Sequence, residues 1–516
     1  MNLRSLTFGP LAILLMTSQA HAVTACESLK SLPLENTTIT LAQSAVAGEF
    51  SLPAQGQVTA QQNAIFKQLP AFCRVAATLK PSSDSDIKIE VWMPLANWNG
   101  KFQAVGNGGW AGSITYSAGV GGIERGMAQA LMRGYATAST DTGHTGNTAA
   151  PMLGHPEKLV DYAYRAVHEM TVASKAILAA FYGQPAILSY FNGCSTGGRQ
   201  ALIEAQRYPS DFDGIIAGAA ANPKTHLDAW RIWMAQAMLK DEASYIPSSK
   251  YPVIHQAVVA KCDALDGVKD GLIEDPTQCH FDPKILQCKG TDGAACLTAA
   301  QVAAARVIMS PVKDRNTGAE IFPGFAAGNE LEWGLMLRGP DPYYNALDDF
   351  KYVVFGNPNW DWRTFNLERD LATANKVTQG KLTAVDPNLS SFKQHGSRLL
   401  MYHGWSDQDV GPQASVNYYT SASSATKAIS SDWLRLFMAP GMNHCGGGEG
   451  PNSFDAMTAL EQWVEHGKAP DQLIASHRGA DGKVDRTRPL CPYPQIAKYK
   501  GSGSIDDAAN FACSVP

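Results

Sequence analysis

The chain has 516 residues, of which 42 are Lys or Arg and 47 are Asp or Glu, for a formal net charge of −5. This length is enough for about two or three domain-sized units. The small negative charge and the lack of any basic run argue against nucleic acid as a partner.

Residues 1–22 have the pattern of a secretory signal peptide. Arg4 supplies a positive start, residues 11–16 supply an apolar core, and residues 20–22 (Ala-His-Ala) offer a small-x-small cleavage site. A transmembrane anchor is the alternative, but the apolar run is shorter than the roughly 20 residues needed to span a bilayer, and no later segment reaches that length. We therefore expect a periplasmic or secreted protein that has no membrane contact after cleavage.

The next part of the chain alternates predicted strands and helices. Apolar alternation predicts strands at 87–93, 102–105 and 135–140, and the second of these runs into the glycine loop 106–109. A long helix over 159–181 is followed by a strand at 186–191, a helix at 198–208 and a strand at 214–217. This alternation predicts a parallel sheet covered by helices.

The alternation stops between about 222 and 395, where loops rich in Asp, Gly, Asn and Pro are mixed with many aromatic residues. It resumes with strands at 398–403 and 433–438 and a helix at 454–465. We interpret 23–221 and 396–516 as one α/β core, and 222–395 as an inserted lid domain.

Residues 193–197 (Gly-Cys-Ser-Thr-Gly) match the G-x-S-x-G pattern around Ser195. The pattern by itself is common in glycine-rich chains, but here it lies between a predicted strand and a predicted helix. Glycines at such a junction permit the sharp turn that lifts a serine hydroxyl clear of the sheet. The combination predicts an α/β-hydrolase core in which Ser195 is the nucleophile.

A serine nucleophile needs a general base and hydrogen-bond donors for the oxyanion. The amide of Thr196, at the start of the helix, is one expected donor. The second should come from the loop 106–109, with Gly109 or Gly108 as the candidate. An ordinary tight turn is the alternative interpretation of that loop.

In α/β-hydrolases the acid and the base follow the nucleophile in the order Ser, Asp, His, each after a strand. Asp407 follows the strand at 398–403, and His444 follows the strand at 433–438. We expect Asp407 to orient the imidazole and His444 to take the Ser195 proton. Asp409 is the rival acid and His403 the rival base.

Ten cysteines form an even set in a chain with an export signal, which favours five disulfides over buried free thiols. Cys194 directly precedes Ser195, and Cys445 directly follows His444. A hydrogen bond between Ser195 and His444 would bring these two cysteines within bonding range. We therefore expect a Cys194–Cys445 bridge that joins the nucleophile loop to the base loop.

An acidic loop between Cys262 and Cys279 has the composition of a calcium site. Hard oxygen ligands at this density suit Ca²⁺. The expected ligands are side chains and backbone carbonyls, in this order along the chain: Asp263, Asp266, the Val268 carbonyl, Asp270 and the Leu272 carbonyl. The ion would be structural. A solvated acidic turn held by a disulfide is the alternative.

Four segments together resemble the tannase and feruloyl esterase family, which includes the enzyme that hydrolyses mono(2-hydroxyethyl) terephthalate. They are residues 193–199, 402–407, 441–445 and the acidic loop 262–270. The resemblance implies an α/β-hydrolase core with a calcium-binding lid, a triad braced by Cys194–Cys445, and small-molecule esters of aromatic carboxylic acids as substrates. It also implies four further bridges: Cys26–Cys73, Cys262–Cys279, Cys288–Cys296 and Cys491–Cys513.

The acyl group stays open among feruloyl, galloyl and terephthaloyl types, and the sequence leaves the oligomeric state open. Arg338 is a candidate partner for a terephthalate carboxylate. Aromatic residues between 230 and 362 are candidates for pocket walls, with lid core as the alternative. A secreted phenolic-binding protein without catalysis and a peptidase with the same triad are the competing functions.

Overall fold

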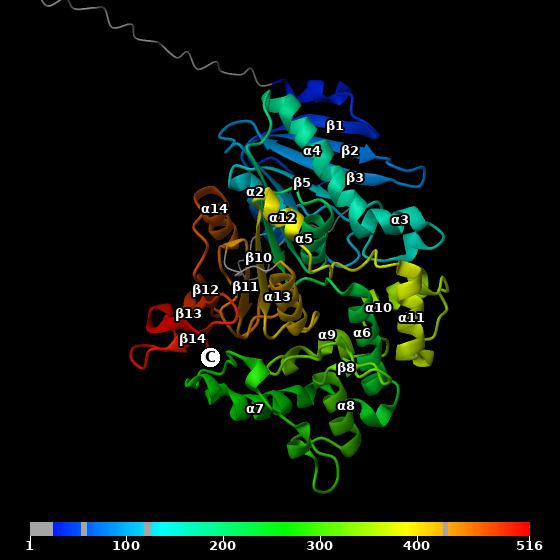
Figure 1. The fold of residues 1–516 in the computed structure, drawn as a ribbon, viewed down its shortest axis with the longest axis vertical. Helices are drawn as coiled ribbons and strands as arrows, with labels where there is room; N and C mark the ends of the chain where they lie inside the picture. Colours follow the sequence, from blue (N-terminus) through cyan, green and yellow to red (C-terminus); the bar gives the residue numbers. More distant parts are fainter. Residues whose placement is uncertain (1–23, 53–58, 118–124, 427–431) are drawn as a thin grey trace, which may run out of the picture.

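The computed structural model describes residues 24–52, 59–117, 125–426 and 432–516 (Figure 1). The signal peptide predicted for residues 1–22 lies outside the described residues. Within the described ranges, no helix combines the length and the apolar character that crossing a bilayer requires.

A nine-stranded sheet forms the centre of the molecule, in the order β1-β2-β3-β5-β4-β6-β7-β10-β11 (Figure 1). Pairs from β5 to β11 are parallel, whereas β1–β2, β2–β3 and β3–β5 are antiparallel. The strands are β1 Thr37–Ala45, β2 Phe72–Leu79, β3 Ile87–Pro94, β4 Lys101–Val105, β5 Ala136–Thr140, β6 Leu188–Cys194, β7 Gly214–Gly218, β10 Arg398–Gly404 and β11 Leu434–Ala439.

The prediction of a parallel sheet is wrong for its N-terminal part. Two strands there, β1 and β2, were not predicted; they pair antiparallel with each other, and β2 pairs antiparallel with β3. The link from Leu79 to Ile87 is too short for the helical crossover that parallel neighbours need, so β2 and β3 form a hairpin. The sheet is therefore mixed, with the parallel part carrying the predicted nucleophile.

Helices cover both faces of the sheet, and two apolar clusters lie between the layers. Helices α4, α5 and α13 contribute to one cluster, and α2 and α14 to the other. Burial on both faces explains the nearly continuous apolar sequence of β11, all of whose residues are buried. The helices of the core are α1 Ala60–Phe66, α2 Met127–Met132, α3 Pro156–Val160, α4 Ala166–Tyr182, α5 Thr196–Arg207, α12 Ser390–His395, α13 Gln413–Ala425 and α14 Ala456–His466.

The predicted long helix is present but contains a wider turn. A π-helical segment, Asp161–Arg165, joins α3 to α4, and Gly183 ends α4 in the left-handed conformation with φ 70°.

Residues 222–395 are mostly helical and have an apolar cluster of their own (Figure 1, green to yellow). Val410 and Ala414, which follow β10, pack into that cluster, so it continues up to the end of the central sheet. The elements before α12 are α6 Lys224–Leu239, α7 Tyr251–Cys262, α8 Ala299–Met309, β8 Val312–Lys313, β9 Glu320–Phe322, α9 Gly334–Leu337, α10 Tyr344–Asp348 and α11 Leu367–Thr378.

Two small hairpins that the sequence did not predict close the chain. They are formed by β12 Leu473–Arg478 with β13 Val484–Leu490, and by β14 Ile496–Tyr499 with β15 Phe511–Ser514. The predicted bridge Cys491–Cys513 is present and joins the end of the first hairpin to the second.

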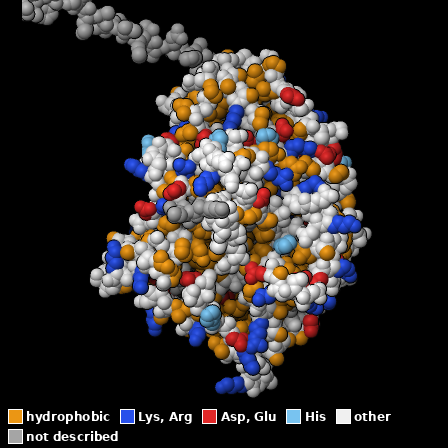
Figure 2. Space-filling model, viewed as in Figure 1, with side chains coloured by type: hydrophobic (Ala, Val, Ile, Leu, Met, Phe, Trp, Pro, Cys, Tyr) orange, Lys and Arg blue, Asp and Glu red, His pale blue; other side chains and the backbone are white. Residues whose placement is uncertain are grey.

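Acidic and basic side chains are interspersed on the face of the molecule shown in Figure 2, among many apolar atoms. This distribution matches the nearly balanced charge of the sequence. The visible face therefore carries no extended basic surface of the kind that binds polyanions.

Candidate active site

Ser195 lies in the sharp turn between β6 and α5, with φ 64° and ψ −123°. A non-glycine residue rarely adopts this conformation, and here the surrounding backbone fixes it. The Ser195 amide donates to the Gly218 carbonyl at 3.0 Å, and the Ser195 carbonyl accepts from the Ala221 amide at 3.1 Å. Glycine is required at 193 because a Cβ there would lie 2.4 Å from the Gly197 carbonyl oxygen.

The predicted oxyanion donors lie on either side of this turn. The Thr196 hydroxyl donates to the Gly109 carbonyl at 2.7 Å, which ties the glycine loop to the start of α5. Gly109 has φ 57°, and a Cβ there would lie 2.3 Å from Asn147 Oδ1, so the position accepts no side chain. In the described part of the chain the amides of Thr196 and Gly109 donate no hydrogen bond to the protein.

Asp407 and His444 form a close pair after β10 and β11. His444 Nδ1 lies 2.7 Å from Asp407 Oδ2, and the Asp407 side chain is fully buried. The other carboxylate oxygen accepts the amides of Asp409 at 2.7 Å and Val410 at 2.8 Å. With Nδ1–H donating to Asp407, the second ring nitrogen, Nε2, is left as an acceptor.

His403, the rival base, lies on the far side of Asp407. Its Nε2 is 3.0 Å from Asp407 Oδ2 and 3.1 Å from the Val410 carbonyl oxygen, so this nitrogen carries the proton. Its Nδ1 then accepts from the Ser415 hydroxyl at 2.7 Å. Both ring nitrogens are occupied and the side chain is fully buried, which leaves His403 no access to substrate.

The charges of this group follow from its burial and its partners. Burial by itself would raise the pKa of Asp407, but His444 and His403 together hold that pKa below its ordinary value. For His444, burial lowers the pKa, whereas Asp407 and then Asp409 raise it, and the net change is upward. The imidazolium form of His444 is thus stabilised by two carboxylates.

Asp409, the rival acid, is placed on the other side of the imidazole. Its Oδ2 lies 3.5 Å from His444 Nε2, the nitrogen opposite the one that Asp407 contacts. In the structure no hydrogen bond between described residues joins the Ser195 hydroxyl to this ring; catalytic hydrogen bonds are often longer before substrate binds.

The predicted Cys194–Cys445 disulfide is present, with Cα atoms 6.0 Å apart. It links the residue before Ser195 to the residue after His444, although the two cysteines are separated by 251 positions in the sequence. The other four predicted bridges are also formed, and the described residues include no free cysteine.

Ser195 and His444 line one cavity of about 310 Å³. The inserted segment contributes Tyr343, Tyr344 and Asn345 to its wall. The other lining residues come from the glycine loop, the region before α2, and the segments next to Ser195, Asp407 and His444. They are Gly106, Asn107, Gly108, Gly109, Thr115, Arg125, Gly193, Cys194, Asp409 and Cys445. Two tyrosines thus line the same cavity as the serine, as expected for a site that binds an aromatic group.

The arginine in this wall is Arg125, whereas Arg338 does not line the cavity. The Arg338 carbonyl accepts from the Tyr245 hydroxyl within the inserted segment. Arg125 donates from Nη2 to the Cys445 carbonyl at 3.4 Å. Among the described residues, Arg125 and not Arg338 is therefore the cationic side chain that lines this cavity, and no local motif in the sequence identified it.

Each carboxylate of the acidic loop accepts hydrogen bonds from the loop backbone. Asp263 accepts the amide of Asp270 at 3.1 Å, Asp266 that of Val268 at 2.9 Å, and Asp270 that of Leu272 at 3.1 Å. The carboxylate oxygens of these three described residues do not all lie within 4.8 Å of one another.

The donor chemistry and charge of the loop nevertheless fit a hard cation. Burial, together with the neighbouring carboxylates of Asp270 and Asp263, raises the pKa of Asp266 to about 6. Glu274, further along the same loop, is buried as well, and burial raises its pKa to about 8. Arg488, which pairs with Asp270, supplies a compensating positive charge. Oxygen donors with unbalanced negative charge are what Ca²⁺ prefers.

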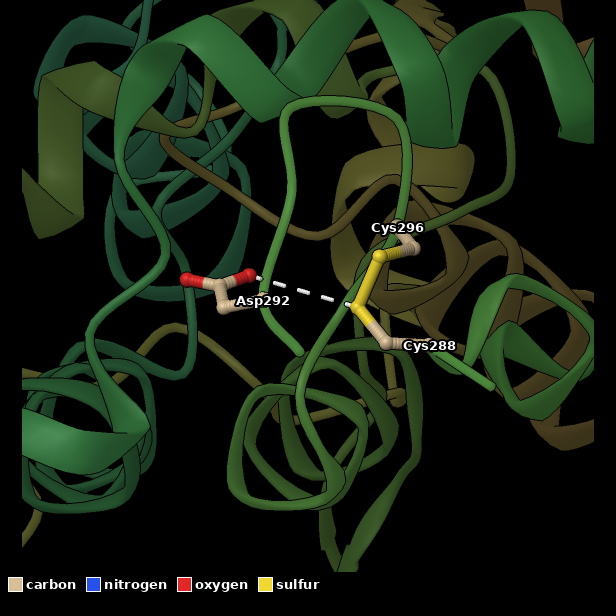
Figure 3. A group of neighbouring side chains, drawn as sticks. All are labelled: Cys288, Asp292 and Cys296. Carbon is tan, nitrogen blue, oxygen red and sulfur yellow. Dashed lines mark hydrogen bonds between the residues drawn. A yellow bond between two sulfur atoms is a disulfide. The ribbon is translucent and has the colours of Figure 1, made fainter. Parts of the chain in front are cut away.

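Two other clusters of possible metal ligands are explained without a metal. Figure 3 shows Cys288, Asp292 and Cys296, but the two sulfurs are joined in a disulfide and Asp292 pairs with Lys250.

The second cluster is His168, Glu204 and Asp211. Burial and the adjacent Asp211 raise the pKa of Glu204 well above its ordinary value, which favours a protonated carboxyl group over a metal-binding carboxylate. His168 Nδ1 lies 2.7 Å from Asp211, which gives that carboxylate a partner.

Comparison with known proteins identifies the family. The family model described as tannase and feruloyl esterase matches residues 73–514. An uncharacterized esterase of Xanthomonas campestris pv. campestris is 37% identical, over 98% of this chain and 94% of the relative. Feruloyl esterase B of Aspergillus niger is 32% identical, over 94% of this chain and 95% of the relative.

A solved structure agrees with these sequence relatives. The crystal structure of feruloyl esterase B from Aspergillus oryzae matches with a TM-score of 0.87 and 32% identity, over 95% of this chain and 99% of that chain. The mixed sheet with helices on both faces is thus an α/β-hydrolase type of fold. The chain belongs to the tannase and feruloyl esterase family and is a carboxylic ester hydrolase.

Proposed function

We propose that this protein is an exported serine esterase that hydrolyses esters of aromatic carboxylic acids through an acyl-enzyme. The observation that supports it most directly is the placement of Ser195 and His444 in one cavity, with Asp407 bound to the far nitrogen of the imidazole. The family relatives named feruloyl esterase support the substrate class.

In acylation the Ser195 hydroxyl oxygen attacks the ester carbonyl carbon, and its proton passes to His444 Nε2. Negative charge develops on the carbonyl oxygen, where the amides of Thr196 and Gly109 donate to it. Asp407 stabilises the imidazolium that forms. When the tetrahedral intermediate collapses, the ester C–O bond breaks, and His444 returns its proton to the departing alkoxide.

Deacylation repeats these steps with water. His444 removes a proton from the water as its oxygen attacks the acyl carbon, and the bond to Ser195 breaks. The serine oxygen takes the proton back from His444, and the carboxylic acid leaves. The Cys194–Cys445 bridge limits relative movement of the two loops through both half-reactions.

In this proposal the inserted segment is the lid of the site. Tyr343 and Tyr344 supply aromatic surface against which an aromatic acyl or alcohol group packs. Arg125 gives the same cavity a positive charge, which suits esters that also carry a carboxylate, such as a terephthalate monoester. Feruloyl, galloyl and terephthaloyl esters are therefore the substrates to compare.

We also propose that the acidic loop binds Ca²⁺ as a structural ion. The side chains of Asp263, Asp266 and Asp270 and the carbonyls of Val268 and Leu272 would hold it. When bound, the ion neutralises the carboxylates and cross-links the loop. Export is supported by the five disulfides, which are typical of oxidising compartments.

Hydrolysis of methyl ferulate, methyl gallate and monomethyl terephthalate by the purified protein tests the proposal. Ser195→Ala should abolish release of all three acids, while Ser189→Ala, on the same strand but outside the cavity, should leave the rates unchanged. Turnover that survives Ser195→Ala would remove this serine from the mechanism.

Covalent labelling separates the esterase from the competing functions. A fluorophosphonate should modify Ser195, whereas a binding protein without catalysis would stay unlabelled. A peptidase would also be labelled, but it would cleave a peptide panel faster than the aryl esters.

A further inference from the structure

Asp409 places a second carboxylate at the catalytic imidazole. Its Oδ2 lies 3.5 Å from His444 Nε2, the nitrogen that takes the Ser195 proton in the proposed mechanism. An unscreened carboxylate at this position would have two effects: it would stabilise the imidazolium during the reaction, and it would also favour a resting imidazole that is already protonated. A protonated imidazole cannot accept the serine proton. The activity of His444 as a base therefore depends on how much of the Asp409 charge is compensated by a neighbouring cation.

Arg231 of α6 contacts this carboxylate directly. Its Nη2 pairs with Asp409 Oδ1 and donates to the Asp409 carbonyl at 3.0 Å, and its side chain is only 4% exposed. Its Nη1 lies 2.7 Å from Asp228 Oδ1. The guanidinium carbon also lies 5.0 Å from the ring centre of Tyr343, a residue of the cavity wall. Four contacts therefore fix the guanidinium beside the carboxylate.

The charges around Arg231 balance. Lys224 lies 2.6 Å from the other oxygen of Asp228, so Lys224 and Arg231 face Asp228 and Asp409 as two cations and two anions. Asp349, next to Asp228, is fully buried, and burial raises its pKa well above the ordinary value, which favours its neutral form. Since an arginine stays charged at all working pH values, the compensation of Asp409 is permanent.

We propose that Arg231 is a positioning residue for the catalytic base: it holds the Asp409 carboxylate beside His444 and neutralises enough of its charge to keep the imidazole free to accept the serine proton. The inserted segment thus takes part in the chemistry through the electrostatics of the base, in addition to covering the site. This inference rests on the proposed function, in which His444 is the base.

Other charged groups around His444 set the background for this effect. Burial lowers the pKa of His444, and Asp407, which contacts Nδ1, raises it. Arg125, from the region before α2, lowers it, and His403 lies behind Asp407. None of these groups contacts Arg231, so removing Arg231 changes the field at Nε2 chiefly through Asp409.

The pH dependence of kcat/KM for methyl ferulate tests the proposal. The acid limb of this profile reports the pKa of the free base. Arg231→Met should move that limb to higher pH by about one unit, which lowers activity about tenfold below the midpoint. Asp409→Asn should move it to lower pH, because a neutral amide replaces the carboxylate. The double variant should return close to the wild-type profile.

Two further variants separate electrostatics from folding. Arg231→Lys keeps the charge and should restore most of the wild-type acid limb. Arg165→Met is the matched control, because Arg165 pairs with the buried Asp161 at 2.6 Å but does not line the cavity. It should lose thermal stability without any change in the pH profile.

An acid limb that stays in place in folded Arg231→Met, or that moves in the same direction in Arg231→Met and Asp409→Asn, would overturn the inference. If Arg231→Met does not fold, Asp409→Asn and Arg231→Lys still decide it: an unchanged acid limb in Asp409→Asn would show that this carboxylate does not influence the base. Failure of the proposed function is a separate result, seen as hydrolysis that persists in Ser195→Ala.

Discussion

Removing the Cys194–Cys445 bridge should weaken both the fold and the catalytic geometry. The bridge closes 251 residues of chain, and the loop-entropy relation gives a stabilisation of about 5.5 kcal/mol for a loop of that length. The Cys288–Cys296 bridge closes only 8 residues, for which the same relation gives about 2.5 kcal/mol. The two bridges therefore form a matched pair of tests.

The double variant Cys194→Ala/Cys445→Ala should lose roughly twice the unfolding free energy that Cys288→Ala/Cys296→Ala loses, measured by guanidinium denaturation. Its kcat on methyl ferulate should also fall by about 100-fold at temperatures where it is folded, because a displacement of about 1 Å at the reacting atoms has an effect of this size. The control variant should keep the wild-type kcat, since its cysteines do not line the catalytic cavity.

Two results would refute this reasoning. One is a folded Cys194→Ala/Cys445→Ala enzyme with wild-type kcat, which would show that packing alone holds the two loops together. The other is a loss of stability no greater than that of the control, which would show that the large loop is already constrained in the unfolded chain.

Three further predictions concern other parts of the molecule. Asp407→Asn should lower kcat by about 10⁴-fold, because the asparagine amide donates to Nδ1 of His444 and so favours the wrong tautomer of the base; a loss below tenfold in steady-state assays would exclude the assigned role. Chelation should lower the melting temperature reversibly, since an ion at 100 times its Kd stabilises the native state by about 2.7 kcal/mol; an unchanged melting curve of metal-free protein, verified by elemental analysis, would leave the loop 262–279 a simple turn. Because the pKa of Glu204 is raised, the folded state keeps a proton that the unfolded chain releases above its ordinary pKa, so the free energy of unfolding falls as pH rises. Between pH 5 and pH 8, Glu204→Gln should therefore lose less stability than wild type in chemical denaturation. Equal losses in the two proteins would contradict this.

Much of the candidate site could be predicted because its signals are local. The strand, the turn and the helix around Ser195 are adjacent in sequence, and the glycines of the turn are required by contacts within a few residues. Asp407 and His444 each follow a buried apolar strand. The apolar runs predict these strands, and the order Ser, Asp, His along the chain then points to the two residues. The cysteines beside Ser195 and His444 gave one long-range constraint, and that bridge is formed.

The N-terminal edge of the sheet and the C-terminal hairpins were missed for a different reason. Strand β1 has a single buried residue, β2 lies beside it at the edge of the sheet, and β14 and β15 have 4 residues each, so most of these segments carry weak apolar patterns. Their conformation is stabilised by pairing with other strands and by the bridges Cys26–Cys73 and Cys491–Cys513. The strand propensity of a single segment does not reveal which other segment it pairs with, so these strands could not be predicted locally.

The chain alone predicted Ser195 as nucleophile, Asp407 and His444 as its partners, and the Cys194–Cys445 bridge, because each prediction rests on a short run of adjacent residues. The structure confirms the bridge and pairs Asp407 with His444. The positions of the two carboxylates on either side of the imidazole, and the contact between Arg231 and Asp409 across 178 positions of sequence, could not be predicted in this way. The physical reason is that electrostatic compensation acts through space: a charge from the inserted segment balances one in the core only after both have folded against the same cavity.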